Sequence, residues 1–353
     1  MEDADFSTIG TRTQIAVLGA GSWGTALAAL LAANGHTIHL WAREPELIAA
    51  LLDDRENARY LPGIHLPPAV TPSADLRDAL SGVGVVVFAV PSGAVREVAQ
   101  KSVWLMPSDA LLLSAAKGLE DNTGLRMSQV LAEVIPGSYH RIVSLSGPNL
   151  AVEVAKGAPT ASVAASANPA AALAAQRLFT GQTNPTFRVY TARDVIGVEL
   201  GGAIKNVIAI FAGVSDGMGL GDNSKAALMT RGLNEAIHVG VAQGAEAQTF
   251  LGLSGVGDLI ATGTSKLSRN YRVGYALGQG RSLATVLAEL GQVAEGVPTT
   301  SVLCKLARQS NVEAPLFSAL RSMIVDNRSA SDVMRELMLR PPKEERLALG
   351  ELR

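Results

Sequence analysis

The chain has 353 residues, of which 48% are hydrophobic and 18% are charged, with a formal net charge of -2. This length favours two domains over a single core, and the composition is that of a globular rather than a disordered protein. The nearly balanced charge gives no electrostatic basis for binding nucleic acid or a membrane surface, so an anionic small substrate would have to be bound by local cations.

No targeting segment is expected at the start of the chain. Residues 1–12 are polar and of mixed charge, and no apolar run is expected to reach the ~18 to 20 residues of a membrane-spanning helix. The single cysteine, Cys304, cannot form an intrachain disulfide and is expected to be a small buried apolar residue. We therefore expect a cytoplasmic protein without membrane insertion.

The first recognisable structure is a βαβ unit. A β-rich run at 14–18 is followed by a glycine-rich turn, a helix that ends at Asn34-Gly35, and a second strand at 36–41. Continuous apolar strands in the region that follows are typical of a doubly wound sheet covered on both faces. Further elements are predicted as strands at 83–90, 110–115, 142–145, 160–165 and 186–190, helices at 93–101 and 125–135, and a loop at 60–72.

The second half is predicted to be helical. A long apolar helix covers 194–214, the glycines of 217–221 interrupt it, and helical patterns continue to about residue 339. The predicted fold is α/β, with an N-terminal Rossmann-type doubly wound sheet and a C-terminal all-helical domain. The expected boundaries are 1–190 for the dinucleotide-binding domain and 191–340 for the helical substrate domain, followed by a charged tail at 341–353.

The glycine-rich turn indicates a dinucleotide site. Gly19, Gly21 and Gly24 form a GxGxxG motif directly after a strand and at the start of a helix. In this context Gly19 makes the turn, Gly21 lets the backbone approach a pyrophosphate, and Gly24 lets the helix pack closely. After the second strand, Arg43 favours the 2′-phosphate of NADP whereas Glu44 keeps NAD open, so either cofactor is expected.

The long helix carries the candidate catalytic residue. Lys205 lies among the apolar residues of 195–214, and its burial would lower its pKa toward the range of a general acid or base. The preceding Gly201-Gly202 pair predicts close approach by another backbone segment. Lys117, which follows a strand, is a second candidate, and its charge would lower the pKa of Lys205 further.

Other polar residues of the second half suit an anionic substrate. Ser268, Arg269 and Asn270 at a helix start can offer hydrogen-bond donors to a phosphate. Asp258 can bond a substrate hydroxyl or orient a lysine. The alternatives for these positions are a helix cap and a turn aspartate. The five histidines are dispersed, so no metal site is expected.

These segments together resemble one family closely, the bacterial-type NAD(P)-dependent glycerol-3-phosphate dehydrogenases. The matching text runs in family order over residues 14 to 320 and reads GAGSWGTALA, YLPGIHLP, AAKGLE, SGPN, ELGGAIKNVIAI, GVGDLIAT, SRNYRVG and QVAEGVPT. Two positions depart from the family pattern: Ala116 stands where threonine is common, and Asn149 replaces the serine or threonine that usually follows Gly-Pro.

The resemblance implies the interconversion of dihydroxyacetone phosphate and sn-glycerol 3-phosphate with NADP or NAD, in the reducing direction for phospholipid synthesis. It also implies a homodimer and a role for Lys205 as the catalytic acid and base. The substrate contacts that it implies are Lys117, Gly147, Asn149, Lys205, Asp258, Ser268, Arg269 and Asn270. The cofactor contacts that it implies, besides the three glycines, are Ser22, Trp23, Arg43, Lys117, Ala151, Arg269, Val293 and Glu295.

Two other functions fit parts of the pattern. A β-hydroxyacid-type dehydrogenase for a sugar acid or ketopantoate also has a helix lysine but recognises a carboxylate, and the SRN and KGLE segments argue against it. A catalytically silent NAD(P)-sensing protein would not need Lys205. Turnover of dihydroxyacetone phosphate compared with ketopantoate separates these functions.

Overall fold

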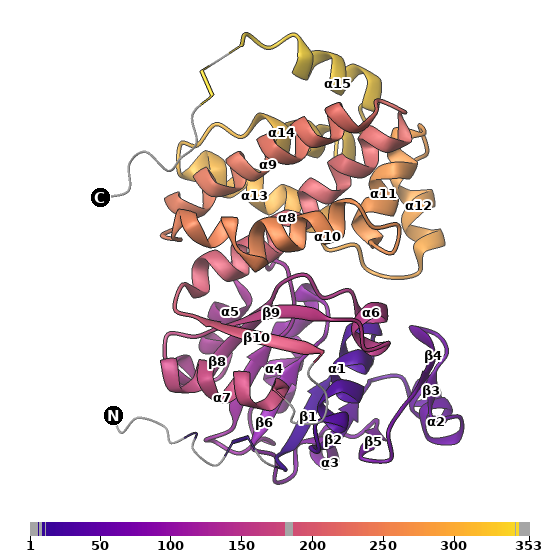
Figure 1. Cartoon of the computed structure of the whole chain (residues 1–353), viewed down its shortest axis with the longest axis vertical. Helices are drawn as coiled ribbons and strands as arrows, with labels where there is room; N and C mark the ends of the chain where they lie inside the picture. Colours follow the sequence, from indigo (N-terminus) through magenta and orange to yellow (C-terminus); the bar gives the residue numbers. More distant parts are fainter. Residues whose placement is uncertain (1–5, 7–8, 11, 181–185, 343, 346–353) are drawn as a thin grey trace. The chain divides into compact units, whose positions relative to one another are not determined.

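The computed structural model describes residues 6, 9–10, 12–180, 186–342 and 344–345. The chain divides into two compact units (Figure 1). Unit 1 contains residues 1–116 and 127–195, and unit 2 contains residues 117–126 and 196–353. The segment 117–126 therefore groups with the second half of the chain. The single boundary predicted at residue 190 places this segment in the first domain instead. The functional division at that boundary stays a prediction.

An eight-stranded sheet forms the centre of unit 1, in the order β10-β9-β8-β7-β6-β1-β2-β5. Neighbouring strands are parallel, except that β8 and β9 are antiparallel. The predicted Rossmann-type sheet is confirmed, with this one reversal added. Its strands are β1 (Gln14–Leu18), β2 (Thr37–Trp41), β5 (Val70–Ser73), β6 (Val85–Phe88), β7 (Leu111–Ser114), β8 (Ile142–Ser146), β9 (Thr160–Ala165) and β10 (Phe187–Ala192).

The loop predicted at 60–72 is partly wrong. It contains β4 (Leu61–His65), which pairs with β3 (Glu56–Asn57) in a separate two-stranded sheet, and it contains the start of β5. Pro62 and Pro72 led to the prediction of a loop, because proline lacks an N–H and is typical of loops. In a sheet it is tolerated at an edge, and β5 is an edge strand.

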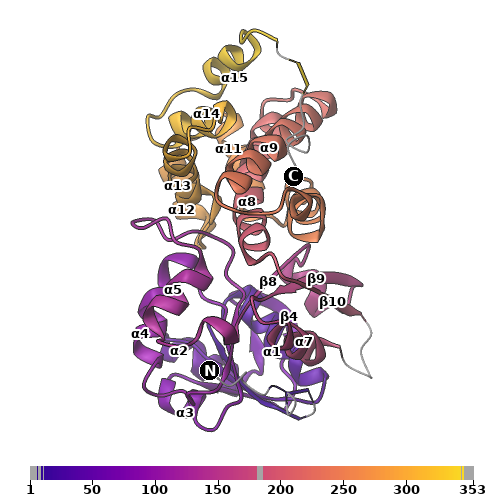
Figure 2. The same cartoon turned by 90° about the vertical axis from the view of Figure 1, so that its left-hand side faces the viewer.

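Helices cover both faces of the large sheet. Figure 2 shows α4 (Val95–Ser102) and α5 (Met127–Val134) on one face, and α1 (Ser22–Ala33) and α7 (Pro169–Phe179) on the other. Strands β6 and β7 are buried along their whole length, and apart from Ser114 at the end of β7 their residues are apolar, as is typical of strands covered on both faces. The remaining α-helices of unit 1 are α2 (Pro45–Asp53), α3 (Leu76–Leu80) and α6 (Ala151–Ala155).

Unit 2 is built around the long helix α8 (Val195–Gly217), in which residues 197–215 are all buried. The glycines at 217–221 end it as predicted, because α9 begins at Asp222. A π-helical turn at Leu253–Gly257 leads into α10. The other helices are α9 (Asp222–Ala242), α10 (Asp258–Gly263), α11 (Arg269–Gly278), α12 (Leu283–Leu290), α13 (Gly296–Gln309), α14 (Pro315–Ile324) and α15 (Ala330–Met338).

Glycines allow α8 and α11 to pack with their backbones in contact. A Cβ at Gly213 would lie 2.1 Å from the carbonyl oxygen of Tyr271, and a Cβ at Gly274 would lie 1.8 Å from that of Ile210. One turn further along each helix, Gly217 and Gly278 are equally crowded by backbone atoms. Because a real Cβ cannot occupy these positions, the crossing of the two helices depends on glycine.

Helix α8 corrects one expectation from the sequence, because it is long and apolar enough by composition to cross a bilayer. Within the protein, however, 83% of its most apolar window is buried. That burial is typical of the central helix of a globular domain, which is apolar on every side. Cys304, on α13, is buried and free as expected.

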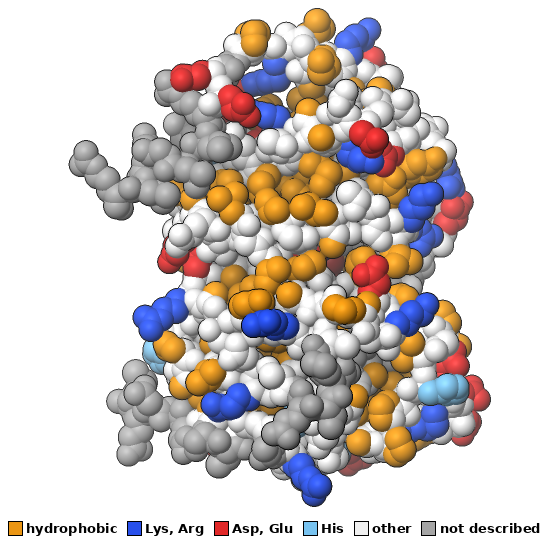
Figure 3. Space-filling model, in the orientation of Figure 1, with side chains coloured by type: hydrophobic (Ala, Val, Ile, Leu, Met, Phe, Trp, Pro, Cys, Tyr) orange, Lys and Arg blue, Asp and Glu red, His pale blue; other side chains and the backbone are white. Residues whose placement is uncertain are grey.

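The surface carries both signs of charge and some apolar side chains. On the face drawn in Figure 3, Lys and Arg side chains are interspersed with Asp and Glu, in keeping with the small net charge. Unit 2 exposes several large apolar side chains near α10, among them Leu251, Ile260 and Leu267, each about half exposed. Such side chains are candidates for contact with another protein surface.

Candidate active site

The glycine-rich turn between β1 and α1 has the predicted geometry. Gly19 has a φ of +116°, and a Cβ there would lie 2.9 Å from the backbone of Ala89. A Cβ at Gly24 would lie 1.8 Å from the carbonyl oxygen of Gly19. Around a Cβ at Gly21, by contrast, the space is open to 4 Å among the described residues. The turn is closed by packing at Gly19 and Gly24 and leaves room at Gly21 for a phosphate.

A buried asparagine that the sequence analysis missed supports this turn. Asn57 Nδ2 donates to the carbonyl oxygen of Ala20 and to Thr25 Oγ1, both at 2.8 Å, and its Oδ1 accepts from the Tyr60 amide at 3.1 Å. Ser22 Oγ in turn donates to the Tyr60 carbonyl at 2.5 Å. Local motifs give no sign of Asn57, because its partners in the turn lie 37 and 32 residues away in sequence.

The start of α1 offers hydrogen-bond donors to an anion. Its N-cap residue is Gly21, which supplies no side-chain cap, so the first helix amides depend on another acceptor. The indole Nε1 of Trp23 is buried and has no hydrogen-bond partner among the described residues. A buried donor left in this state costs about 1–3 kcal/mol, which a bound acceptor would offset. These features fit a dinucleotide held at the turn.

The two charged residues that follow β2 pair with each other. Arg43 Nε donates to Glu44 Oε1 at 2.9 Å, and the two side chains are 79% and 35% exposed. Glu44 is also the N-cap residue of α2, directly before Pro45. In Rossmann folds this end of the second strand meets the adenosine ribose of the dinucleotide. The chain therefore presents one cation and one carboxylate at that place.

The SGPN segment connects β8 to α6. Gly147 has a φ of +129°, and a Cβ there would lie 3.0 Å from the Cα of Ser162, so the position requires glycine. Asn149 is buried and donates through Nδ2 to Ser162 Oγ at 3.1 Å. Ala151 is the first residue of α6. The amide of Asn149 is thus engaged with β9, and its contact with substrate stays a prediction.

In unit 2, the candidate catalytic lysine belongs to a buried cluster of charges. Lys205 Nζ donates to Thr262 Oγ1 at 2.7 Å and lies 3.0 Å from Asp258 Oδ1. The other carboxylate oxygen, Asp258 Oδ2, accepts from Lys117 Nζ at 2.8 Å. Lys205 is 7% exposed and Asp258 is 1% exposed. Of the two alternatives left open for Asp258, the structure favours the one in which it orients a lysine.

The electrostatics of this cluster agree with the prediction from sequence. Burial lowers the pKa of Lys205 to about 8, and the charge of Asp258 opposes this change whereas the charge of Lys117 adds to it. For Asp258, burial alone would raise the pKa, but the two ammonium groups outweigh burial and hold the pKa of the carboxyl below its usual value. The cluster therefore combines a charged carboxylate with an amine that titrates near neutral pH.

Close backbone packing fixes α8 beside Asp258. A Cβ at Gly201 would lie 2.9 Å from the carbonyl oxygen of Ser254, which confirms the close approach predicted for the Gly201-Gly202 pair. Ser254 lies in the π-helical turn that directly precedes Asp258. Irregular turns of this kind often occur at functional sites, because they redirect a side chain within a helix. Here the turn brings the start of α10 against α8.

Two asparagines connect Lys117 with the rest of unit 2. Asn206 Nδ2 donates to the carbonyl oxygen of Lys117 at 3.2 Å, and Asn270 Nδ2 donates to Asn206 Oδ1 at 2.8 Å. Asn270 Oδ1 accepts from the amide of Gly296 at 2.9 Å. Both ends of the Asn270 amide are thus engaged within the protein. This chain of hydrogen bonds joins α8, α11, α13 and the segment that carries Lys117.

The SRN segment combines a helix cap with a cation. Ser268 is the N-cap residue of α11, and its side chain accepts from the Tyr271 amide at 3.2 Å, which is the capping alternative considered for it. Arg269 is the first residue of that helix and is exposed. A cationic residue thus stands at the positive end of α11, a combination that suits a phosphate.

Val293 and Glu295 lie in the connection before α13. Val293 helps to line a cavity of about 400 Å³ with Leu287, Gln292, Val297 and other residues of this connection. Glu295 is the N-cap residue of α13. Desolvation lowers the pKa of the Arg269 guanidinium, and the charge of Glu295 opposes this change.

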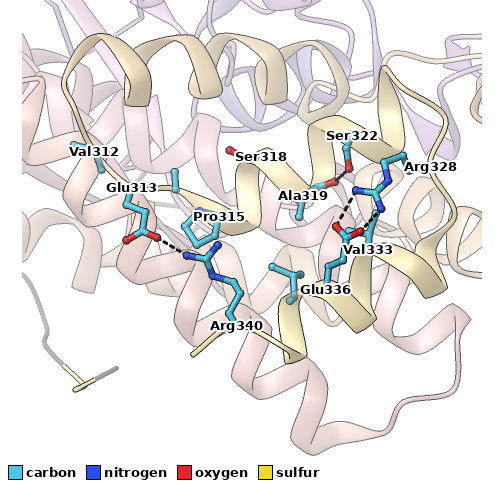
Figure 4. A pocket seen from close by; sticks show the side chains of 12 residues that line it. Val312, Glu313, Pro315, Ser318, Ala319, Ser322, Arg328, Val333, Glu336 and Arg340 are labelled. Atoms are coloured by element: carbon cyan, nitrogen blue, oxygen red, sulfur yellow. Dashed lines mark hydrogen bonds and ion pairs between the residues drawn. The ribbon is translucent and has the colours of Figure 1, made fainter. Parts of the chain in front are cut away.

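A second cavity, of about 490 Å³, lies between α14 and α15 (Figure 4). Its charged lining residues are paired: Arg328 bonds Glu336, and Arg340 bonds Glu313. The residues that line it include no predicted site residue.

A buried carboxylate, Glu235 of α9, caps α14. Its Oε1 accepts from the Leu316 amide at 2.8 Å and its Oε2 from the Phe317 amide at 3.1 Å. Burial raises the pKa of Glu235 to about 7, although these two amides favour the charged form. Because α14 has no side-chain cap of its own, Glu235 supplies its N-terminal acceptors from another helix.

Comparisons with known proteins add independent information. Residues 14–172 match the model of the NAD-dependent glycerol-3-phosphate dehydrogenase N-terminus, and residues 194–335 match the model of the C-terminus. The chain belongs to the NAD-dependent glycerol-3-phosphate dehydrogenase family. Residues 173–193, which include the end of α7 and strand β10, lie between the two matches, and the family resemblance found in the sequence extends over both units.

Relatives in this family align over nearly their whole length. The glycerol-3-phosphate dehydrogenase [NAD(P)+] of Citrifermentans bemidjiense is 48% identical over 94% of this chain and 98% of its own. That of Moorella thermoacetica is 48% identical over 95% of this chain and 98% of its own. The crystal structure of glycerol-3-phosphate dehydrogenase from Coxiella burnetii is 37% identical and superposes with a TM-score of 0.87, covering 93% of this chain and 99% of that chain.

A ketopantoate reductase from Ralstonia eutropha shares the fold at greater distance. It is 15% identical, with a TM-score of 0.56, and covers 91% of this chain and 99% of that chain. This likeness concerns the fold alone, so it does not favour the ketopantoate alternative over the family to which the chain belongs.

Proposed function

This chain is an NAD(P)-dependent glycerol-3-phosphate dehydrogenase, and we propose that Lys205 gives and takes the proton of its reaction. It reduces dihydroxyacetone phosphate to sn-glycerol 3-phosphate and catalyses the reverse. The observation that carries the role of Lys205 is its buried ammonium, 3.0 Å from Asp258, with a pKa lowered to about 8. A group that titrates near neutral pH can both donate and accept a proton.

The proton inventory of the reduction follows from this cluster. The substrate carbonyl carbon gains a hydride, and the electron pair of the C=O π bond moves onto the oxygen. Lys205 Nζ donates its proton to that oxygen and becomes a neutral amine, which solvent reprotonates. Lys117, bound to the other oxygen of Asp258, adds positive charge that stabilises the developing alkoxide. In the oxidation the neutral amine of Lys205 takes the hydroxyl proton.

The glycine-rich turn is the proposed cofactor site. When bound, NADH or NADPH supplies the hydride. The open space at Gly21, the uncapped start of α1 and the unpartnered indole of Trp23 support this assignment. The residues proposed to hold the cofactor are Gly19, Gly21, Ser22, Trp23, Gly24, Arg43, Lys117, Ala151, Arg269, Val293 and Glu295.

Arg269 is proposed to bind the substrate phosphate. Its position at the start of α11 combines a planar cation with helix amides, which together match a phosphate dianion. Binding the remote phosphate positions the carbonyl, so binding energy contributes to the chemical step. The further substrate contacts proposed are Lys117, Gly147, Asn149, Lys205, Asp258, Ser268 and Asn270.

A direct assay tests the activity. Oxidation of NADH and NADPH is followed by absorbance with dihydroxyacetone phosphate and, separately, with ketopantoate. We expect turnover only with the triose phosphate. Activity with ketopantoate alone would identify a different dehydrogenase, and cofactor binding without turnover of either compound would identify a sensing protein.

Variants test the residue roles. Lys205→Ala should lose turnover while cofactor affinity stays within about twofold, and Lys266→Ala, which removes an exposed lysine of the same unit, should behave like the parent. Arg269→Ala should mainly raise KM, because it removes phosphate binding. Retained kcat in Lys205→Ala, or an unchanged KM in Arg269→Ala, would contradict these assignments.

The wider setting is part of the same proposal. We assign cofactor binding to residues 1–190 and substrate chemistry to 191–340, and we infer a cytoplasmic homodimer that supplies sn-glycerol 3-phosphate for phospholipid synthesis. The exposed apolar side chains near α10 support self-association. Light scattering after size exclusion should give twice the 36.6 kDa mass of the chain; a monomer at micromolar concentration would refute the dimer.

A further inference from the structure

The chain places two conflicting signals for cofactor choice side by side. An acidic side chain after the second strand of a Rossmann fold accepts a hydrogen bond from the adenosine ribose of NAD, whereas an arginine there pairs with the 2′-phosphate of NADP. Here Arg43 and Glu44 occupy adjacent positions after β2 and bond each other at 2.9 Å. The guanidinium that would meet the 2′-phosphate already has a carboxylate partner.

We propose that Glu44 determines cofactor selectivity by competing with the 2′-phosphate of NADP for Arg43. The proposal rests on the proposed cofactor site and deepens it. With NADH, the Arg43–Glu44 pair stays intact and the Glu44 carboxylate is available to a ribose hydroxyl. With NADPH, the phosphate takes the place of Glu44 on Arg43. The chain thus binds both cofactors, and Glu44 reduces its preference for NADPH.

Replacing Glu44 by the phosphate as the partner of Arg43 costs little free energy in this structure. Arg43 is 79% exposed and Glu44 is 35% exposed, so the pair is screened by water and contributes little stability. Glu44 is the N-cap residue of α2, where the positive end of the helix stabilises a carboxylate that has left its arginine. The phosphate dianion, with more charge and three oxygens, is the better partner for a guanidinium. Exchange therefore needs only a side-chain rotation of Glu44.

The affinity of nucleotide fragments measures the effect without turnover. Binding of 2′,5′-ADP and of 5′-AMP to the full chain is followed by calorimetry at low and high salt. The variants are Glu44→Gln, which removes the competing charge, and Glu46→Gln, a matched control with the same charge change at an exposed position in the first turn of α2. Arg43→Met and the double variant Arg43→Met/Glu44→Gln complete a cycle.

We expect Glu44→Gln to tighten 2′,5′-ADP binding by about two- to fivefold at low salt, the upper part of the range of an exposed ion pair, and to leave the affinity for 5′-AMP nearly unchanged. The gain should shrink at high salt and be absent in Glu46→Gln. In the Arg43→Met background, Glu44→Gln should have less than about half of this effect, because the competition needs Arg43.

Three results would overturn the proposal. The first is an unchanged ratio of the two affinities in Glu44→Gln, and the second is an equal gain in Glu46→Gln. The third is the same gain with and without Arg43. If the parent chain binds neither fragment nor either intact cofactor, the cofactor site itself is wrong and the proposed function fails with it. Fragment binding that does not respond to Glu44 overturns the selectivity inference alone.

Discussion

Raising the pH should remove the proton that Lys205 donates, and the reduction should slow accordingly. The pKa of Lys205 in the unliganded protein is about 8, against an ordinary 10.5. This difference corresponds to roughly 3 kcal/mol by which the buried site disfavours the ammonium. The fraction of Lys205 that is protonated is then about nine-tenths at pH 7, about one-tenth at pH 9 and about one-hundredth at pH 10. We expect kcat/KM for reduction to fall about tenfold per unit above pH 8.

The reverse reaction should show the opposite dependence. Oxidation of sn-glycerol 3-phosphate needs the neutral amine, so its kcat/KM should rise with pH and level off above pH 8. Two variants should move the midpoint of these pH profiles in opposite directions. Lys117→Met removes a positive neighbour and should raise the pKa of Lys205, whereas Asp258→Asn removes the negative partner and should lower it, each by about one to three units.

The assay is the initial rate of cofactor absorbance change from pH 7 to 10.5, at limiting substrate and saturating cofactor. A slower rate with deuterated cofactor at each pH establishes that hydride transfer limits the rate. A profile for reduction that stays flat to pH 10 would refute the assignment of the proton donor. So would shifts of the same sign in Lys117→Met and Asp258→Asn, because the charges of the two residues act on Lys205 in opposite directions.

Three further predictions concern other parts of the chain. Gly21→Ala should fold normally, because the space around its Cβ is open, and should weaken cofactor binding, because that space is assigned to the cofactor phosphate. Gly24→Ala should weaken binding and also lower the melting temperature, because its Cβ would lie 1.8 Å from the Gly19 oxygen. Equal melting temperatures of the two variants would contradict this prediction. Gly213→Ala should destabilise unit 2 by about 2 kcal/mol or more in denaturant unfolding, because its Cβ would lie 2.1 Å from a backbone oxygen of α11, and Gly93→Ala, in open space, is the control. Glu235 has a folded pKa of about 7, raised above its unfolded value of 4.5, so its contribution to stability is complete below pH 4.5 and is lost as the pH rises through 7. Glu235→Gln should therefore gain stability relative to the parent between pH 5 and pH 8, measured as the difference in melting temperature; a difference that is constant with pH would count against the shifted pKa.

The sequence predicted best those features that depend on local pattern. The turn at Gly19 and Gly24 follows from the motif and its place between a strand and a helix. The burial of Lys205 follows from the apolar residues around it in one long helix, because such a helix has no polar face to turn toward water. In both cases, neighbours in sequence determine the outcome.

Features made by distant residues could not be predicted in this way. Asp258 lies 141 residues from Lys117, and the hydrogen bond between them has no local signature. Ser268 could be assigned as a substrate residue or as a helix cap, and only the structure shows its side chain on the Tyr271 amide. The grouping of residues 117–126 with unit 2 also depends on contacts with distant helices, such as the bond from Asn206 to the Lys117 carbonyl.

The charges around Asp258 lead to one more consequence of the proposed mechanism. Two ammonium groups contact a single carboxylate, and the positive charges of Lys117 and Arg269 both lower the pKa of Lys205. A substrate phosphate dianion bound beside these cations would oppose their effect and raise the pKa of Lys205. The pH dependence of kcat reports pKa values in the enzyme–substrate complex, and that of kcat/KM reports those of the free enzyme. For the reduction, the midpoint of the kcat profile should therefore lie at higher pH than the midpoint of the kcat/KM profile. Equal midpoints would mean that the substrate's charge does not act on Lys205, and the phosphate would then have to bind away from this cluster.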